Sequence, residues 1–208
     1  MRRTNWKTVS TLVTIGLLAG CMDRSISAPA STSVAPVSMM LAPQGAPQLS
    51  LALGKSENTS VDFTVGVKGG VFRVGSNAAV VIPAHGICDL TSTYGLGYWD
   101  DPCTPLGVPL KVHAEVRNEQ GRTWVDFTPA VRFVPSDNPK KWAYIIMSTP
   151  GAKGAEDISR FIILYSPIIG GASIDESAQD ASLVTYVDQS SGMSMRRIKH
   201  WSGYNSWG

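Results

Sequence analysis

From residue 59 onward, apolar and polar positions alternate along the chain. Val61, Phe63, Val65 and Val67 are separated by polar residues or glycine, which is the period-two pattern of a half-buried β-strand. Further short runs follow at a spacing of roughly ten residues, bounded by glycine and proline. The pattern predicts strands at residues 61–67, 71–74, 78–82, 110–117, 122–127, 130–134, 142–147, 160–165, 183–187 and 193–201.

These short strands, with no long amphipathic helix among them, predict an all-β domain at residues 58–208. About nine or ten antiparallel strands of this length fit a Greek-key β-sandwich. The nearly continuous apolar run at 160–165 favours a central strand. The acidic residues 173–180 are expected to form a loop, and the aromatic-rich residues 201–208 the last, edge strand.

Residues 1–20 have the pattern of an export signal. A short basic segment is followed by an apolar run, Thr8 to Leu18, that falls short of the about twenty residues a membrane-spanning helix needs. Leu18-Ala19-Gly20-Cys21 comes next and resembles the lipobox of bacterial lipoproteins. The resemblance implies cleavage before Cys21 and a diacylglycerol on its sulfur, so that the mature protein begins with a lipidated cysteine.

Acyl chains on Cys21 would hold the protein on a membrane, because each buried methylene contributes about 0.8 kcal/mol. In enterobacterial lipoproteins an aspartate directly after the cysteine favours the inner membrane. Met22 stands there in this chain, so the expected location is the cell envelope, at the outer membrane. An ordinary signal peptide with a chance cysteine and a twin-arginine signal at Arg2-Arg3 are the alternatives.

Composition divides the mature chain into a tether and a domain. Residues 21–57 are rich in Ala, Ser, Pro and Gln and lack a hydrophobic period, which predicts a disordered, flexible tether behind the lipid. The whole chain has 18 basic and 16 acidic residues. Removal of Arg2, Arg3 and Lys7 leaves 18 − 3 = 15 basic residues against 16 acidic ones. A near-neutral domain without a basic stripe is not expected to bind nucleic acid.

Cys88 and Cys103 remain once Cys21 is assigned to the lipid. Because export leads to an oxidising compartment, we expect a disulfide between them. A loop of about 15 residues closed in this way contributes on the order of 3 kcal/mol. The alternative is a metal site that includes His85 or Asp101, although the tight spacing of zinc-binding cysteine pairs is missing.

Three segments together resemble the ZU-five domain of ankyrins, netrin receptors and zonula occludens proteins, in its bacterial form. They are the residues 69–72 (Gly-Gly-Val-Phe), 80–84 (Val-Val-Ile-Pro-Ala) and 200–204 (His-Trp-Ser-Gly-Tyr). The residues between Pro83 and Val108, with both cysteines, depart from the animal pattern as a long insertion. The resemblance implies a β-sandwich, and an interaction module in animal members, but it implies no ligand.

His200-Trp201-Ser202 is the segment with the clearest chemistry. Some relatives of this fold cleave themselves at His-x-Ser, where the serine hydroxyl attacks the preceding carbonyl and histidine takes the proton. Here the cut would fall between Trp201 and Ser202. The alternative is that the three residues only pack the last strand. No G-x-S-x-G motif supports a hydrolase triad with His85, His113 or His200, and a hydrolase with two converging carboxylates stays a further alternative.

The residues inside the expected disulfide form a candidate ligand patch, which consists of Tyr94, Tyr98, Trp99, Asp100 and Asp101. Aromatic rings with flanking carboxylates on a pinned loop are suited to stacking a sugar ring or to binding a partner protein. The alternatives are an aromatic lid folded back on the sandwich and a calcium site formed by Asp89 with the two other aspartates.

These observations predict a lipid-anchored β-sandwich that acts in the envelope as a binding or structural module, without enzymatic activity. Its expected partners are the membrane, through the lipid on Cys21, and a protein or glycan of the envelope. No cofactor or metal ion is expected. Self-cleavage at Ser202 and hydrolysis by a carboxylate pair are the rival functions.

Overall fold

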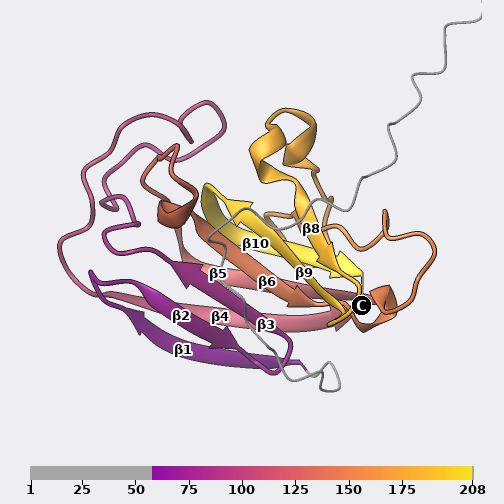
Figure 1. The fold of residues 1–208 in the computed structure, drawn as a ribbon. Helices are drawn as coiled ribbons and strands as arrows, with labels where there is room; N and C mark the ends of the chain where they lie inside the picture. Colours follow the sequence, from indigo (N-terminus) through magenta and orange to yellow (C-terminus); the bar gives the residue numbers. More distant parts are fainter. Residues whose placement is uncertain (1–57, 208) are drawn as a thin grey trace, which may run out of the picture. The chain divides into compact units, whose positions relative to one another are not determined.

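The structure, a computed structural model, describes residues 58–207, and the expectations for residues 1–57 lie outside this range. Two antiparallel five-stranded sheets face each other (Figure 1). One has the order β1 (Thr59–Val65), β4 (Leu110–Glu119), β5 (Arg122–Arg132), β10 (His200–Trp207) and β7 (Leu164–Tyr165). The other has the order β2 (Gly70–Val74), β3 (Ala78–Ile82), β6 (Ala143–Ser148), β9 (Met193–Ile198) and β8 (Thr185–Asp188). The predicted all-β sandwich is confirmed.

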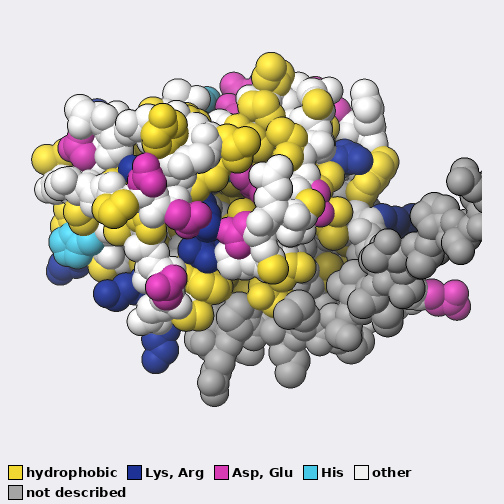
Figure 2. Space-filling view, turned by 90° about the horizontal axis from the view of Figure 1, so that it is seen from above, with side chains coloured by type: hydrophobic (Ala, Val, Ile, Leu, Met, Phe, Trp, Pro, Cys, Tyr) yellow, Lys and Arg dark blue, Asp and Glu magenta, His cyan; other side chains and the backbone are white. Residues whose placement is uncertain are grey.

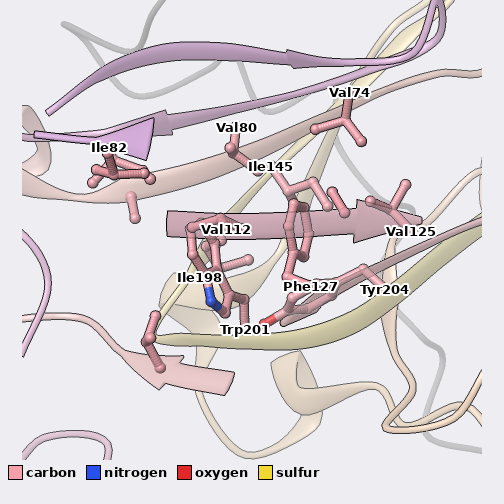
Figure 3. Close-up of a cluster of buried hydrophobic side chains, with 14 of the residues drawn as sticks. Val74, Val80, Ile82, Val112, Val125, Phe127, Ile145, Ile198, Trp201 and Tyr204 are labelled. Carbon is pink, nitrogen blue, oxygen red and sulfur yellow. The ribbon is translucent and has the colours of Figure 1, made fainter. Parts of the chain in front are cut away.

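The core lies between the two sheets and uses one side of each strand. Val112, Ala114 and Val116 alternate with partly exposed polar residues on β4, as a half-buried strand requires. Figure 3 shows Phe127 of β5 lying against Trp201 of β10. Their rings are stacked with centroids 4.8 Å apart, and both side chains are almost completely buried.

A bulge in β10 decides which of its side chains enter the core. The pairing of β10 with β5 shifts register between Trp201 and Gly203. Trp201 and Tyr204 are an odd number of positions apart and would face opposite sides of a regular strand, yet both are buried in the same core cluster. Gly203 permits the close approach, since a Cβ there would lie 2.2 Å from the backbone oxygen of Ser166.

Several strand boundaries differ from the prediction. Residues 122–127 and 130–134 belong to one strand, β5, which continues through Pro129 and ends at Arg132. The run 193–201 is divided at Lys199, where the chain passes from β9 in one sheet to β10 in the other. The tail is not an edge strand, because β10 lies between β5 and β7.

The apolar run 160–165 is not a central strand. Only Leu164 and Tyr165 form a strand, and it lies at the edge of its sheet. Phe161 and Ile163 are apolar because they fill the core, where both are completely buried. Their backbone groups form hydrogen bonds with side chains and not with a neighbouring strand. Ser194 Oγ donates to Phe161 O (2.8 Å), and Ile163 N donates to Thr185 Oγ1 (3.0 Å).

The helical elements of the described residues are four short 3-10 turns, Pro139–Lys141 (η1), Pro150–Ala152 (η2), Glu176–Ala178 (η3) and Ala181–Leu183 (η4). Within residues 58–207, none of them has the length and hydropathy of a membrane-spanning helix. Two of them, η3 and η4, belong to the segment between β7 and β8, which lies at the top of the domain in Figure 1.

Candidate functional site

The long loop between β3 and β4 is held in place by a disulfide and by hydrogen bonds from Arg132. The predicted disulfide between Cys88 and Cys103 is confirmed, with Cα atoms 5.6 Å apart. The buried Arg132 guanidinium of β5 donates to the backbone oxygens of Tyr98 and Asp101 (2.7 Å for the latter). Because these restraints act on both ends and the middle of the loop, the aromatic residues within it are fixed against the body of the domain.

The loop covers His200, the first residue of β10. The Trp99 indole stacks on the imidazole with ring centroids 4.0 Å apart and an interplanar angle of 17°. Tyr94 meets Trp99 edge to face at 4.8 Å, and its hydroxyl lies 3.2 Å from His200 Nδ1. The lid predicted as an alternative for these aromatic residues therefore exists, with the imidazole beneath it.

Glu176 contacts His200 from the other side. Asp175 caps the η3 turn by accepting from the Ser177 amide at 3.0 Å, which places Glu176 at the first position of the turn. His200 Nε2 donates to Glu176 Oε1 at 2.7 Å, and the fully buried Arg196 donates to Glu176 Oε2 at 3.2 Å. One carboxylate thus joins a histidine and an arginine, which offsets the cost of burying the guanidinium.

The Tyr94 hydroxyl is the most connected group of the site. It donates to the backbone oxygen of Trp201 at 3.1 Å, in addition to its contact with His200. Burial raises the pKa of Tyr94 well above its usual value, and a hydrogen bond with Ser202 acts in the opposite direction. The phenol therefore stays protonated at neutral pH and serves as a hydrogen-bond donor.

Lys199 connects the loop to the η3–η4 segment. Its ammonium lies 2.6 Å from Asp100 Oδ1 and 2.5 Å from Asp180 Oδ2. Burial acts to raise the pKa of Asp180, but hydrogen bonds from Lys199 and Ser182 outweigh it and lower that pKa to about 2. Asp180 is therefore ionised at any physiological pH, and the lysine is bracketed by two carboxylates.

A cavity of about 400 Å³ lies between the loop and the η3–η4 segment. This volume is in the range of small-molecule sites, about 300–1,000 Å³. Figure 2 shows this side of the domain, where acidic and basic side chains lie among hydrophobic ones. The lining residues are Tyr94, Gly95, Leu96, Gly97, Trp99, Asp100, Tyr165, Ile174, Glu176, Gln179, Asp180, Leu183 and Lys199.

Three members of the predicted ligand patch line this cavity, namely Tyr94, Trp99 and Asp100. Tyr98 and Asp101 do not, and their backbone oxygens accept from Arg132 instead. Gly95 and Gly97, on either side of Leu96, have φ angles of 137° and 98°, which glycine adopts without the strain that other residues would meet.

The calcium alternative finds no support in the geometry. Asp100 pairs with Lys199, whereas Asp89 accepts from Thr91 within its own turn. Across residues 58–207 no group of three or more His, Cys, Asp or Glu side chains is arranged to hold a metal ion. His85 and Asp101 likewise do not join the two cysteines, which form the disulfide.

His113 lies away from the cavity, on the solvated side of β4. It contacts Asp62 of β1 at 2.7 Å, and this hydrogen bond raises the pKa of the imidazole. His113 therefore takes no part in the site.

The residues of the predicted self-cleavage are close together but not in direct contact. Both nitrogens of His200 are engaged, by Tyr94 and Glu176, while Ser202 Oγ lies 3.5 Å from the hydroxyl of Tyr165. Ser202 occupies the bulge of β10, between Trp201 and Gly203. The Trp201 carbonyl, where the cut would occur, accepts from Tyr94.

Sequence reasoning missed Glu176, Arg196, Lys199 and Tyr165 as parts of the site. The sequence of β9 gives no signal for Arg196, because its apolar residues Met193, Met195 and Ile198 do not alternate and all six residues of the strand are buried. An arginine there needs a buried anion, which Glu176 supplies. The pairing itself depends on the fold of the η3–η4 segment, for which the sequence showed no period.

Comparison of the chain with family models, with curated proteins and with solved structures finds no match. The candidate site therefore has to be interpreted from its own geometry.

Proposed function

We propose that this chain is a lipid-anchored, non-catalytic binding module of the bacterial cell envelope, and that the cavity beside Trp99 holds its ligand. The lipobox-like residues 18–21 support the anchor, with Cys21 as the lipidated residue. The cavity supports the binding role. The resemblance to ZU-five domains is consistent with an interaction module.

The observation that carries this proposal is the preorganised aromatic wall of the cavity. A disulfide, the Arg132 hydrogen bonds and the Lys199–Asp100 ion pair hold the wall from three directions. A wall fixed before binding loses little conformational freedom when a ligand arrives, which favours affinity. A loop that had only to cover the sandwich would not need an open, lined space beneath its tip.

The test is cosedimentation of residues 22–208, which lack the lipid-bearing Cys21, with two envelope preparations, peptidoglycan sacculi and outer-membrane vesicles. The proposal expects binding to at least one of them, with Trp99→Ala abolishing it and Tyr98→Ala leaving it unchanged. Tyr98 is the matched control because it lies in the same loop, is 44% exposed and does not line the cavity. Binding to neither preparation, or equal binding by both variants, contradicts the proposal.

A second candidate function, self-cleavage between Trp201 and Ser202, is supported by one specific observation. The bond to be cut lies in the bulge of β10, and Tyr94 already donates to the Trp201 carbonyl. In this reaction Ser202 Oγ adds to that carbonyl carbon, the C–N bond breaks, and the proton passes to the new amine. Water then hydrolyses the resulting ester.

The mass of the denatured, unreduced mature chain separates the two candidates. A mass that extends to Gly208 contradicts self-cleavage under the conditions of expression and agrees with a binding module. A mass that ends at Trp201 would overturn the binding proposal's claim of no catalysis. In that case Ser202→Ala and His200→Ala are expected to restore the full-length chain.

A further inference from the structure

We infer that the ligand of the Trp99 cavity is a neutral pyranose sugar, an inference that rests on the proposed binding function. It assigns roles to three parts of the cavity: Trp99 as the stacking surface, the carboxylates as acceptors for hydroxyl groups, and Lys199 as a cation that is already neutralised.

The stacking surface follows from the contacts of Trp99. His200 covers one face of the indole at 4.0 Å, and Trp99 lines the cavity, so a ring in the cavity can stack only on the other face. The electron-rich face of an indole attracts the polarised C–H groups on one side of a pyranose ring. Tyr94 packs against Trp99 edge to face and lines the same cavity, which keeps the indole from turning.

The polar part of the cavity is rich in acceptors. Asp100, Glu176 and Asp180 line it together with the Gln179 amide. Each of the three carboxylates has a cationic or histidine partner, and each carboxylate can accept further hydrogen bonds. A ligand that brings several hydroxyl donors next to an apolar ring face matches this wall, and sugars have this combination.

The charge balance argues for a neutral sugar. Among the residues that line the cavity, three carry negative charge and one, Lys199, carries positive charge. Lys199 lies within 2.6 Å of one aspartate and 2.5 Å of the other. A uronate or a phosphorylated sugar would therefore meet a net negative field without a spare cation in the lining, and like charges inside a site oppose binding.

The size of the site agrees with one sugar unit exposed at a chain end. A cavity of about 400 Å³ is near the lower limit of small-molecule sites, about 300–1,000 Å³. Leu96, which is 75% exposed, and Ile174, which is 48% exposed, lie on its lining. An apolar rim of this kind suits contact with the next unit of an oligosaccharide.

The experiment is ligand-detected saturation-transfer NMR on the mature chain with glucose, galactose, mannose and N-acetylglucosamine, and with glucuronate as the charged probe. The expected result is binding of at least one neutral sugar with a Kd of about 1 mM or tighter. Trp99→Ala should weaken this binding by about tenfold and Trp99→Phe much less, and glucuronate should bind more weakly than the best neutral sugar.

A second variant tests the cavity independently, in case Trp99→Ala fails to fold. Gln179→Trp places a large side chain at an exposed cavity residue and leaves Tyr94 and Trp99 unchanged, and it should also block the sugar. The inference is overturned if no neutral sugar binds, if glucuronate binds as tightly as the best neutral sugar, or if Gln179→Trp leaves sugar binding intact. Cosedimentation that stays sensitive to Trp99 in such a case would mean that only the ligand class is wrong. If cosedimentation is absent or does not depend on Trp99, the binding function is rejected as well.

Discussion

Trp99 lies flat on His200, with ring centroids 4.0 Å apart, and so joins a disulfide-closed loop to the corner where the chain passes between the two sheets. The imidazole beneath the indole is almost completely buried and is held by Glu176 at 2.7 Å. This relationship fixes the indole at the cavity wall. The burial of this histidine is tolerated because both of its ring nitrogens have partners.

The disulfide should contribute much of the order in the β3–β4 loop. Replacement of both Cys88 and Cys103 by serine is expected to lower the free energy of unfolding by about 3 kcal/mol, because the unfolded chain regains the freedom of a loop of about 15 residues. Urea denaturation measures this loss. Hydrogen exchange should rise at residues 89–102 but not at the β5 core. An unchanged exchange rate in the loop would show that Arg132 and Lys199 hold it without the disulfide.

Asp126 should make the protein less stable as the pH rises. Burial, together with the charge of Glu115 opposite it on β4, raises the pKa of Asp126 to about 6. The folded protein therefore binds this proton more tightly than the unfolded chain, whose carboxyl titrates near 3.8, and stability falls between about pH 4 and 7.

Asp126→Asn is expected to remove this dependence. At pH 7 the variant should be more stable by about 1 kcal/mol, a value reduced for partial exposure of the carboxyl to solvent. At pH 4 the two proteins should differ little. Thermal unfolding over this pH range measures the difference, and an advantage of the variant that is as large at pH 4 as at pH 7 would contradict the account.

The Phe127–Trp201 stack should dominate the core. Trp201→Ala is expected to lower the free energy of unfolding by about 3–5 kcal/mol, because it removes a completely buried indole and leaves a cavity between the sheets. Trp207→Ala is the matched control on the same strand, at a position that is 37% exposed and lies under Arg122. Trp207→Ala should lower the free energy of unfolding by only about 1 kcal/mol. Similar losses for the two variants, measured by urea denaturation, would show that the core is not packed as described.

Glu176 should be needed to keep Arg196 in the interior. The Arg196 side chain is 1% exposed, and its closest carboxylate is Glu176 at 3.2 Å, with Asp175 farther away at 3.7 Å. Glu176→Gln is expected to cost about 3 kcal/mol because it leaves a buried guanidinium without its main counter-charge.

The double variant Glu176→Gln with Arg196→Met tests the reason for that loss. It should recover much of the stability, since the buried charge is removed along with its partner. Chemical denaturation of the two single variants and the double variant forms the cycle that measures their coupling. Additive losses would mean that the two side chains do not depend on each other.

The sequence pattern predicts the fold better than it predicts the site. Strands such as β4 alternate clearly, because one side of each is buried and the other solvated, and their positions agree with prediction. The prediction of a central strand at residues 160–165 was wrong, because complete burial produces the same apolar composition in an irregular segment as in a central strand. The position of β10 inside its sheet could not be predicted from the sequence either, because strand pairing depends on contacts between distant parts of the chain.

The site could be predicted in part. The two cysteines and the aromatic loop between them stand out in the sequence, and the disulfide and the position of Trp99 at a cavity agree with that pattern. Glu176 and Lys199 could not be assigned, because a carboxylate or an ammonium on a polar segment has no sequence signal until the fold brings it beside His200 or Asp180.

The most direct test of the account is the NMR response of the Trp99 indole N–H during titration of the mature chain with the neutral sugar that binds best. Trp99→Phe assigns the Trp99 signal. The internal control is the indole N–H signal of Trp207, which lies at the end of β10 opposite His200. The account predicts that the Trp99 signal shifts and saturates while the Trp207 signal stays in place. A Trp99 signal that does not move while the sugar binds would contradict the claim that the ligand lies in this cavity.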